Sequence, residues 1–260
     1  MLEQTFVHLP IVGETTERRL WEGGVMTWAD ALDATETPRG FSAGRWEYTQ
    51  SALEGSVRAL ECQAHSYFCV NLKRRDHWRA WPEFEARAAF LDIETTGLSS
   101  ADIVTVVGLY DGTRTSTFIA GENLHELPEA LDQYGMLVTY NGASFDLPFL
   151  ARCIPGLSFP QLHVDLMYPL RSLGLRGGLK AVEQRVGLTR APDVAGLDGW
   201  DAVRLWREWR AGSEASLELP VRYNTADIEN LEHLMKLAYR GMRESLKLPC
   251  DSPAEDTHGR

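Results

Sequence analysis

The sequence predicts an α/β protein, in which a mixed β-sheet is flanked by helices and preceded by a small helical region. From Ala86 onward, short apolar runs alternate with helical patterns. Asp111-Gly112 separates two of these runs and is a strong hairpin signal, so the sheet should start antiparallel. We expect three parts: a helical-hairpin region with a connector over 1–85, the sheet domain over 86–246, and a polar, disordered tail over 247–260.

The N-terminal region reads as a helical hairpin. A first helix through Glu17 to Glu22 ends at Gly23-Gly24, and Thr27 with Asp30 forms a capping box for the second helix. In DNA-binding hairpins, the turn glycines present backbone N–H groups to a phosphate. The alternative is a small packing module, and both interpretations stay open at this point.

The sheet domain has a regular order of elements. The pattern predicts one strand over 86–94, two strands within 103–120 and one strand over 136–141. Helical patterns cover 123–133, 145–153, 178–187 and 198–212, and a long final helix runs from about Leu217 to Leu246. Strands that begin antiparallel and then alternate with helices are typical of a mixed sheet with helices on its faces.

Bulk composition excludes some classes of protein. The chain has 260 residues, of which 44% are hydrophobic and 24% charged, with a formal net charge of −11. That charge argues against a sequence-blind nucleic-acid coat protein, although an enzyme can hold nucleic acid through a local basic surface. No apolar run reaches the roughly 18 residues of a membrane span, and the start lacks a signal-peptide pattern, so we expect a cytoplasmic protein without membrane contact.

The four cysteines show no metal-binding or disulfide pattern. They contain no C-x-x-C pair and have no zinc-ligand spacing with the histidines. We therefore expect reduced and mostly buried thiols at Cys62, Cys69, Cys153 and Cys250.

Acidic residues stand where the predicted elements end. Asp92 and Glu94 alternate in "FLDIETTGLSS", so both side chains point to one face of a strand and repel each other. Asp146 follows "VTYNGAS" at a strand-to-helix transition. Tyr223 and Asp227 are four residues apart and share one face of the final helix. A cation that compensates the carboxylate charge would explain why these acids occur together.

Each of these positions also has a structural interpretation. A D-x-E pair occurs by chance, Asp146 can be a helix cap, and Tyr223 with Asp227 can be an exposed pair. Two-metal phosphodiester hydrolysis accounts for all five positions together. Carboxylates without histidine or cysteine suit two Mg²⁺ or Mn²⁺ ions. Asp92 would bridge the ions, Glu94, Asp146 and Asp227 would complete the ligands, and Tyr223 would orient the attacking water.

The turn after the first two acids is the predicted substrate-binding segment. Thr95, Thr96, Gly97 and Leu98 can offer backbone N–H groups and an apolar wedge to a terminal nucleotide, and Asn141 can do likewise. Asp165 is interpreted as a cap or a local hydrogen-bond acceptor, and His163 as a satisfied histidine in the core or at its rim.

Two basic stretches could flank an acidic cleft. Residues 171–210 have a local charge of +3, and the connector holds Lys73, Arg74, Arg75 and Arg79 beside two tryptophans. Solvated helix faces are the competing interpretation for most of these side chains. Trp200, Trp206 and Trp209 are interpreted as packing residues of a helix on the core.

At these residues the sequence resembles the DEDD exonucleases of the RNase H-like superfamily. "LDIETTGL", "YNGASFDLPFL" and "YNTADIENL" are similar to their three motifs, the last in the Y-x-x-x-D form. The resemblance covers about Ala86 to Arg243. Within the superfamily, "LPIVGETTERRLWEGGVMTW", "WPEFEARAAFLDIETTGL" and "HVDLMYP" are similar to the YprB-like bacterial family, which includes a mitomycin-repair exonuclease.

The resemblance implies an RNase H-like fold and a 3′ to 5′ exonuclease that acts on DNA in repair, alongside a helicase. Some relatives carry histidine where this chain has Tyr223, which puts the metal and pH preference in doubt, and larger relatives have helical repeats that are absent from this sequence. Three alternatives stay open: a non-catalytic nucleic-acid-binding or scaffold module of the same fold, an RNA-directed nuclease, and an endonuclease on RNA–DNA hybrids.

Overall fold

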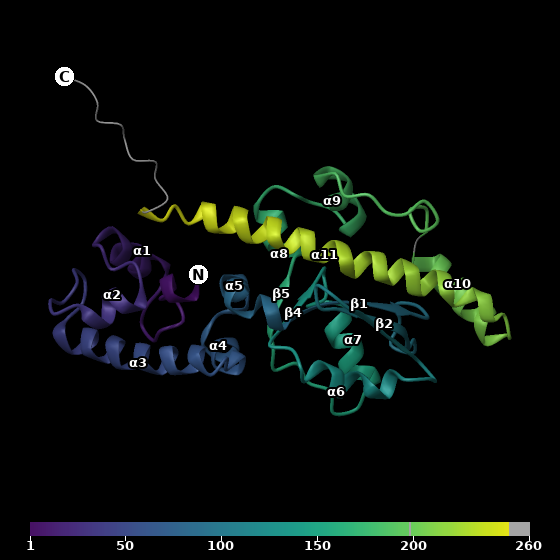
Figure 1. Cartoon of the computed structure of the whole chain (residues 1–260), viewed down its shortest axis with the longest axis horizontal. Helices are drawn as coiled ribbons and strands as arrows, with labels where there is room; N and C mark the ends of the chain where they lie inside the picture. The colour runs from purple at the N-terminus through teal and green to yellow at the C-terminus, as the bar shows by residue number, and fades with distance from the viewer. Residues whose placement is uncertain (198, 250–260) are drawn as a thin grey trace, which may run out of the picture.

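A five-stranded mixed sheet forms the centre of the molecule. The computed structural model describes residues 1–197 and 199–249, and Figure 1 shows their arrangement. The strands follow the order β3-β2-β1-β4-β5 across the sheet. Their bounds are β1 Ala88–Thr95, β2 Val104–Tyr110, β3 Thr115–Ile119, β4 Met136–Thr139 and β5 Leu162–Asp165.

The central strand β1 has different partners on its two sides. It pairs antiparallel with β2, which pairs antiparallel with β3, and parallel with β4, which pairs parallel with β5. Because parallel neighbours end at the same edge, the carboxyl ends of β1, β4 and β5 lie together. The predicted mixed α/β sheet is confirmed, and its edge gathers the loops that carry the acids.

Helices cover both faces of the sheet and form the N-terminal region. In the N-terminal region they are α1 Glu14–Glu22, α2 Trp28–Asp33, α3 Ala43–Glu61, α4 His65–Asn71 and α5 Trp81–Phe84. Around the sheet they are α6 Leu127–Leu131, α7 Asp146–Cys153, α8 Met167–Ser172, α9 Leu179–Val186, α10 Gly199–Arg210 and α11 Glu218–Ser245. Short 3₁₀ turns connect them, including one over Arg74–Ala80.

The alternation of β1 assigns its side chains to two cores. Leu91 and Ile93 pack with Phe149 of α7 in one core. Phe90 points to the other face and packs in the core that contains Ile228 of α11. Figure 1 accordingly shows α6 and α7 on one side of the sheet and α11 across the other. Asp92 and Glu94 share the face of Phe90, so both acids lie under α11.

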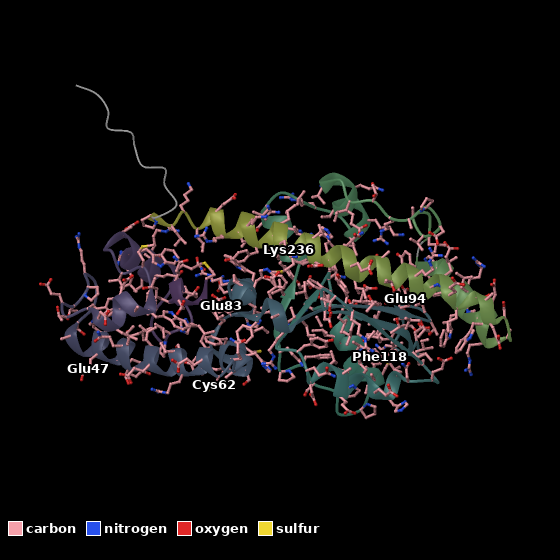
Figure 2. All side chains as sticks on the ribbon, viewed as in Figure 1. Glu47, Cys62, Glu83, Glu94, Phe118 and Lys236 are labelled. Atoms are coloured by element: carbon pink, nitrogen blue, oxygen red, sulfur yellow. The ribbon has the colours of Figure 1, made fainter. Side chains whose placement is uncertain are left out.

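The N-terminal region packs onto the sheet domain through aromatic side chains. The ring centres of Trp81 and Phe90 are 6.0 Å apart, and those of Trp78 and Tyr239 in α11 are 6.1 Å apart. Buried residues from Leu2 to Trp81 belong to the same core cluster as Phe90 and Ile228. Side chains therefore fill the molecule continuously from one end to the other, as Figure 2 shows.

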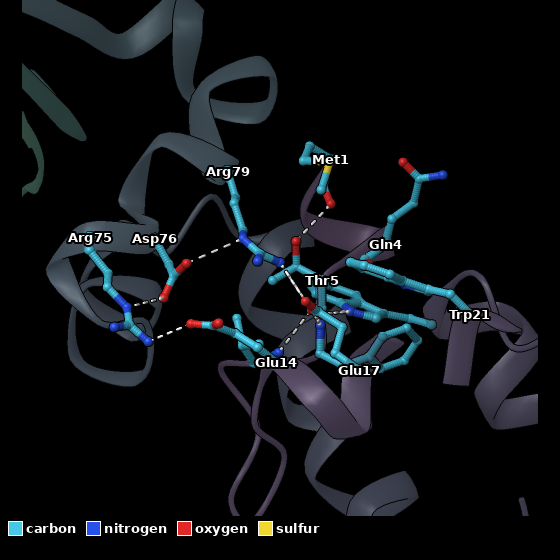
Figure 3. A network of polar contacts seen from close by, with 12 residues as sticks. Met1, Gln4, Thr5, Glu14, Glu17, Trp21, Arg75, Asp76 and Arg79 are labelled. Carbon is cyan, nitrogen blue, oxygen red and sulfur yellow. Dashed lines mark hydrogen bonds and ion pairs between the residues drawn. The ribbon is translucent and has the colours of Figure 1, made fainter. Parts of the chain in front are cut away.

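A buried ion pair fixes the start of the chain against the connector. Arg79 donates to both carboxylate oxygens of Glu17, at 3.0 and 2.8 Å, and the side chains of both residues are 3% exposed or less. Glu17 also accepts from the backbone N–H groups of Phe6 and Val7. Figure 3 shows this network, with Arg79 reaching Asp76 on its other side. Buried charges need such partners because an unpaired one would be strongly destabilising.

The structure contains the helical hairpin, but its turn lacks the free N–H groups that the phosphate-binding interpretation requires. Thr27 and Asp30 form the expected capping box. The N–H groups of Gly23 and Gly24 are hydrogen-bonded to carbonyls in the last turn of α1, including that of Trp21. Neither N–H is therefore available to a phosphate, and the hairpin serves as a packing module.

Two further expectations changed. The sequence pattern missed β5, because a four-residue strand containing His163 and Asp165 carries little periodicity. Cys62 is exposed, and Cys69 and Cys153 are half-buried, so the expectation of mostly buried thiols was wrong for these three residues. Cys250 lies outside the described residues.

The end of the described chain is packed rather than free. Leu248, which falls in the predicted tail, is 1% exposed and belongs to the main core. The tail residues 250–260 lie outside the described residues. Within the described residues, no helix combines the length and apolar character that a membrane crossing requires.

Candidate active site

The carboxyl end of β1 supplies the first two acids. Asp92 and Glu94 both face α11, and Glu94 is 7% exposed. The pairing of β1 with β2 shifts register between Glu94, which pairs with Val106, and Thr95, which pairs with Val104, so a bulge in β2 lies beside the acids. Figure 2 labels Glu94 beside α11. The strand therefore presents two carboxylates to one helix directly before the turn that follows Thr95.

Helix α11 supplies three side chains that face these acids. Tyr223, Asn224 and Asp227 are all buried, at 8%, 1% and 6% exposure. One carboxylate oxygen from each of Asp92, Glu94 and Asp227 lies within 4.8 Å of the other two. Asn224 donates its amide hydrogen to Asp92 Oδ2 at 2.9 Å. The spacing of three and four residues aligns these side chains along one side of the helix.

The fourth acid, Asp146, comes from α7, which packs on the face of the sheet opposite α11. Asp146 is the first residue of α7 and is 3% exposed. Its carboxylate accepts hydrogen bonds from its own backbone N–H and from that of Ile93. The loop before it is tight, because a Cβ on Gly142 would lie 2.3 Å from Thr139 Oγ1. Asp146 thereby lies next to β1 without belonging to the three-residue cluster.

Burial and mutual repulsion act on all four carboxyl groups. Desolvation is the largest cause in each case, and it raises the pKa of Asp92 and Glu94 well above the ordinary values. The charges of Asp227 and Asp146 raise both pKa values further. The pKa of Asp146 rises to about 7 and that of Asp227 to about 6. Without a cation, the site therefore retains protons at pH values where ordinary carboxyl groups are fully ionised.

These carboxylates fit a divalent metal. Hard cations such as Mg²⁺ and Mn²⁺ prefer oxygen ligands, and here three carboxylate oxygens converge while the pKa values show an excess of negative charge. Asp92, Glu94 and Asp227 would hold one ion. The predicted metal ligands from β1 and α11 are thus brought together, and Asp146 stands at the edge of the cluster.

Two cations compensate part of this charge within the described structure. Arg190 forms an ion pair with Asp227 Oδ1, and its Nε and Nη2 donate to Glu183 at 2.8 Å each. Glu183 also accepts from Asn230 at 3.0 Å. Lys180 Nζ lies 4.7 Å from the ring centre of Tyr223. Arg190 and Lys180 of the basic stretch thus contact side chains of α11. For these two residues, the interpretation as a solvated helix face does not hold.

Tyr223 cannot act as a base near neutral pH. Desolvation, followed by the charges of Asp227 and Glu94, raises the pKa of its hydroxyl above the ordinary value. The hydroxyl therefore stays protonated and can donate a hydrogen bond. This agrees with a role in orienting a water molecule beside the carboxylates.

The carboxylates open into a cavity of about 300 Å³, which we term the catalytic cavity. Of the predicted substrate-binding residues, Thr95, Gly97 and Leu98 line it, whereas Thr96 and Asn141 do not. Thr96 instead donates to Asp102 Oδ1, and the backbone N–H of Asn141 donates to Asp165 Oδ1. Leu98 is 75% exposed at the rim, so an apolar side chain stands where the cavity opens.

Trp200 corrects the expectation of a packing residue. It is 69% exposed and lines the catalytic cavity together with Phe145. Trp206 is buried, and its ring centre lies 4.7 Å from that of Trp209, so these two do pack as predicted. The structure thus places the aromatic side chain of Trp200 beside the carboxylates. The spacing of the tryptophans along α10 could not distinguish Trp200 from the two that pack.

Sequence reasoning assigned no role to Asn224 and Gly108, and it placed Arg190 among possible phosphate contacts instead of beside Asp227. Gly108 pairs with Asp92 across β1 and β2, and a Cβ there would lie 2.0 Å from Asn224 Oδ1. The glycine lets α11 approach the sheet closely enough for Asn224 to reach Asp92. An isolated glycine in "VTVVGLY" was the one available signal, since such a residue in a strand indicates close backbone approach.

Gly108→Ala, in the strand next to Asp92, is expected to weaken metal binding. The added Cβ displaces Asn224, so Asp92 loses its amide donor, and we expect the affinity for Mn²⁺ to fall about 10- to 100-fold. Isothermal titration calorimetry measures this. Gly55→Ala in α3 is the matched control, because its Cβ would meet Tyr67 at an ordinary 3.6 Å. Unchanged Mn²⁺ affinity in Gly108→Ala would refute this role for the glycine.

The stability of the metal-free protein is expected to fall between pH 6.5 and 8.5. A carboxyl group with a raised pKa stabilises the fold fully below its unfolded value of 3.8 and loses that contribution as pH rises through its folded pKa, about 7 for Asp146. The buried His8 and His163, with pKa values lowered to about 3, act oppositely only below about pH 6.5.

We expect a loss of at least about 1 kcal/mol over this range, or about 3 °C in Tm. Thermal unfolding in EDTA at pH 6.5 and 8.5 measures it. Asp146→Asn, which cannot ionise at that position, should reduce the dependence. A Tm that rises with pH in EDTA would contradict the argument.

Comparison with known proteins relates the sheet domain to one superfamily. The family model described as RNase_H superfamily matches residues 89–239. Among solved structures, the chain is similar to the family B DNA polymerase from the hyperthermophilic archaeon Pyrobaculum calidifontis, with 17% identity and a TM-score of 0.44 over 62% of this chain. The match spans about a quarter of that polymerase, 24% of its chain.

A second solved structure is similar over a larger share of its own length. It is Brucella melitensis NrnC, with 20% identity and a TM-score of 0.32, and the match covers 69% of this chain and 94% of that chain. No curated protein matches the sequence.

Proposed function

Since the chain belongs to the RNase_H superfamily, we propose that it is a metal-dependent 3′ to 5′ exonuclease that hydrolyses DNA by a two-metal mechanism. The convergence of Asp92, Glu94 and Asp227 oxygens within 4.8 Å, at a cavity on the carboxyl edge of the sheet, carries this proposal. A role in DNA repair, in which the nuclease acts beside a helicase, is part of the same proposal and derives from the motif resemblance.

Each acidic residue would have a role in metal binding that depends on its position in the site. Asp92 is central, because Asn224 fixes one of its oxygens and the repulsion from Glu94, Asp146 and Asp227 meets at its carboxylate. Two Mg²⁺ or Mn²⁺ ions about 4 Å apart would supply an activated water and neutralise charge on the attacking and leaving oxygens. The buried carboxylates would hold that arrangement in a rigid frame of β1, α7 and α11.

The cavity walls support the binding of a chain terminus. Leu98 and Trp200 are largely exposed apolar side chains on the rim, and Phe145, which precedes Asp146 in the chain, also lines the cavity. Apolar and aromatic surfaces grip a terminal base by stacking and wedging. The N–H groups of Gly97 and Leu98, two residues that line the cavity, would add donors for sugar or phosphate oxygens. This combination favours removal of terminal nucleotides over internal cleavage.

One assay separates the proposal from its alternatives. Purified protein is incubated with 5′-labelled and 3′-labelled DNA and RNA oligonucleotides in Mg²⁺, Mn²⁺ or EDTA, with Asp146→Ala as the inactive variant and Asp132→Ala as an exposed acidic control. We expect a ladder that shortens from the 3′ end of DNA and that is lost in EDTA and in Asp146→Ala. Binding without cleavage would indicate a scaffold module. Internal cuts in RNA–DNA hybrids would indicate an endonuclease, and preferential RNA degradation an RNA-directed enzyme.

Tyr223→Phe is expected to lower kcat about 10²-fold while leaving the affinity for Mn²⁺ intact. The ring and its contact with Lys180 remain, and only the hydroxyl that orients water is removed. Single-turnover kinetics and Mn²⁺ titration measure the two quantities separately. A parallel loss of Mn²⁺ affinity would mean that the hydroxyl supports the ligands instead.

A further inference from the structure

A second and larger cavity lies where the N-terminal region meets the sheet domain. Its volume is about 550 Å³, and we call it the junction cavity. Its walls come from α1, from the connector around Arg74, from the carboxyl end of β5 at Asp165, from α8 at Tyr168, and from the end of α11 at Met242. None of Asp92, Glu94, Asp146 and Asp227 lines it, so it is distinct from the carboxylate site.

Among the described residues, the ion pairs of this wall leave one arginine, Arg74, without a carboxylate at ion-pair distance. Arg75 pairs with Glu14, and Arg79 pairs with Asp76 and Glu17, as Figure 3 shows. The third wall acid, Asp165, accepts three backbone N–H groups of Asn141, Ala143 and Met167. Burial raises the pKa of Asp165 and the charge of Arg74 opposes that rise from a distance, but Arg74 is exposed and, within residues 1–197 and 199–249, forms no ion pair. One guanidinium on the cavity wall is thus available to an external anion.

The junction cavity lies beside the catalytic cavity along the sheet edge. Ala143 lines the junction cavity, and Phe145, two residues further in the same loop, lines the catalytic cavity. Asp165 pairs with Thr139, and the neighbouring Val138 pairs with Phe90. Asp165 is therefore level with Leu91, next to Asp92, at a distance of two strand spacings or about 10 Å. That distance corresponds to about three stacked nucleotides at roughly 3.4 Å each.

The rest of the wall suits nucleobases. Tyr168 is 51% exposed, and the apolar surface around it includes Trp78, Pro169, Met242 and Leu246. Proteins that hold single strands combine basic side chains for the backbone with aromatic rings for the bases. The junction cavity has both, and its wall at Asp165 lies at the separation from the carboxylates that an upstream part of the same strand would have.

We propose that the junction cavity binds the single-stranded nucleic-acid segment on the 5′ side of the hydrolysed bond, with Arg74 on a backbone phosphate and Tyr168 stacked on a base. This rests on the proposed function, since it assigns the strand that enters the catalytic cavity. The N-terminal region is then part of the substrate path through the connector that it holds in place.

Variants at the two exposed residues test the site through binding. Arg74→Glu and Tyr168→Ala are compared with wild type by fluorescence anisotropy, using a 12-nucleotide single-stranded DNA in Ca²⁺. Arg58→Glu on the outer face of α3, with a side chain 69% exposed, is the matched charge control. We expect Arg74→Glu to weaken binding about tenfold and to reduce the salt slope by about 0.7, the value for one phosphate contact. Tyr168→Ala should weaken binding by a similar factor, and Arg58→Glu should bind like wild type.

A small substrate separates this site from the chemistry. Thymidine 5′-(p-nitrophenyl phosphate) is too short to reach the junction cavity, so Arg74→Glu and Tyr168→Ala should hydrolyse it in Mn²⁺ at the wild-type rate. If neither wild type nor any variant hydrolyses a phosphodiester, the proposed function fails. The anisotropy experiment still measures whether the junction cavity binds single-stranded DNA. Wild-type affinity for the 12-nucleotide strand in both variants would overturn the junction-cavity proposal, whatever the activity.

Photocross-linking tests the position of the strand. Oligonucleotides carry one 4-thiothymidine at successive positions from the 3′ end, in Ca²⁺ to prevent turnover. We expect cross-links to peptides containing Tyr168 from about the third to fifth nucleotide, and none from the terminal one. Cross-links to the Tyr168 peptide from the terminal nucleotide, or from no position, would overturn the proposal.

Discussion

Replacing Asp92 by asparagine is expected to abolish hydrolysis, with kcat lowered at least about 10³-fold. Asp92 is the carboxylate on which the repulsion from Glu94, Asp146 and Asp227 converges, and Asn224 orients it. Asparagine has the same shape but supplies no negative charge to a metal. The initial rate on a 3′-labelled oligonucleotide measures the effect.

The same variant should be more stable than wild type in EDTA. Folding buries Asp92 among three other acids, and asparagine removes that unfavourable charge. Thermal unfolding with and without Mn²⁺ should therefore show a higher Tm in EDTA and a smaller gain from Mn²⁺. Asp132→Asn, an exposed acid at the end of α6, is the control and should change neither activity nor Tm. Wild-type turnover in Asp92→Asn would refute the assignment of the site.

Arg79→Met is expected to destabilise the fold by about 3–5 kcal/mol. The variant keeps much of the apolar length of the side chain but leaves Glu17, which is 1% exposed, without its cation. Burial already raises the pKa of Glu17, and the Arg79 charge opposes that rise. The midpoint of urea unfolding measures the loss, which corresponds to about 10 °C in Tm for a chain of this size.

Arg75→Met provides the matched comparison. Its side chain is 64% exposed, and its ion pair with Glu14 is on the surface, so we expect a loss below about 1 kcal/mol. The double variant Glu17→Leu with Arg79→Met should recover part of the loss, because it removes the unpaired charge. Equal effects of Arg75→Met and Arg79→Met would contradict the distinction between surface and buried pairs.

The parts of the fold that could be predicted were those with a periodicity or turn motif within a short stretch of sequence. The alternation in β1, the Asp111-Gly112 turn and the long apolar stripe of α11 each carry their own period or turn signal. Strand β5 does not, because its four residues are buried by neighbours: Thr139 hydrogen-bonds to His163 at 2.9 Å, and Asp165 holds the loop before α7. Its status as a strand depends on tertiary contacts that no local pattern records.

The candidate site divides in the same way. Asp92, Glu94, Asp146, Tyr223 and Asp227 could be named because one mechanism requires those residue types together at element ends. Their supporting residues could not. Arg190 reaches Asp227 from a loop 37 positions earlier in the chain, and the role of Asn224 depends on the missing side chain of Gly108 in another strand. Such contacts are properties of the packed fold.

Helix α11 also makes the site mechanically dependent on the other end of the molecule. Asp227 is the tenth of its 28 residues, and Tyr239, in the C-terminal half, packs against Trp78 of the connector. Twelve residues separate Asp227 from Tyr239, so the helix is a lever of about 18 Å between them. A tilt of about 3° about the Tyr239 contact would move Asp227 by about 1 Å, a displacement that can cost an enzyme about 10²-fold in rate. The packing of Trp78 on Tyr239 therefore restrains the helix position on which the geometry of the carboxylates depends.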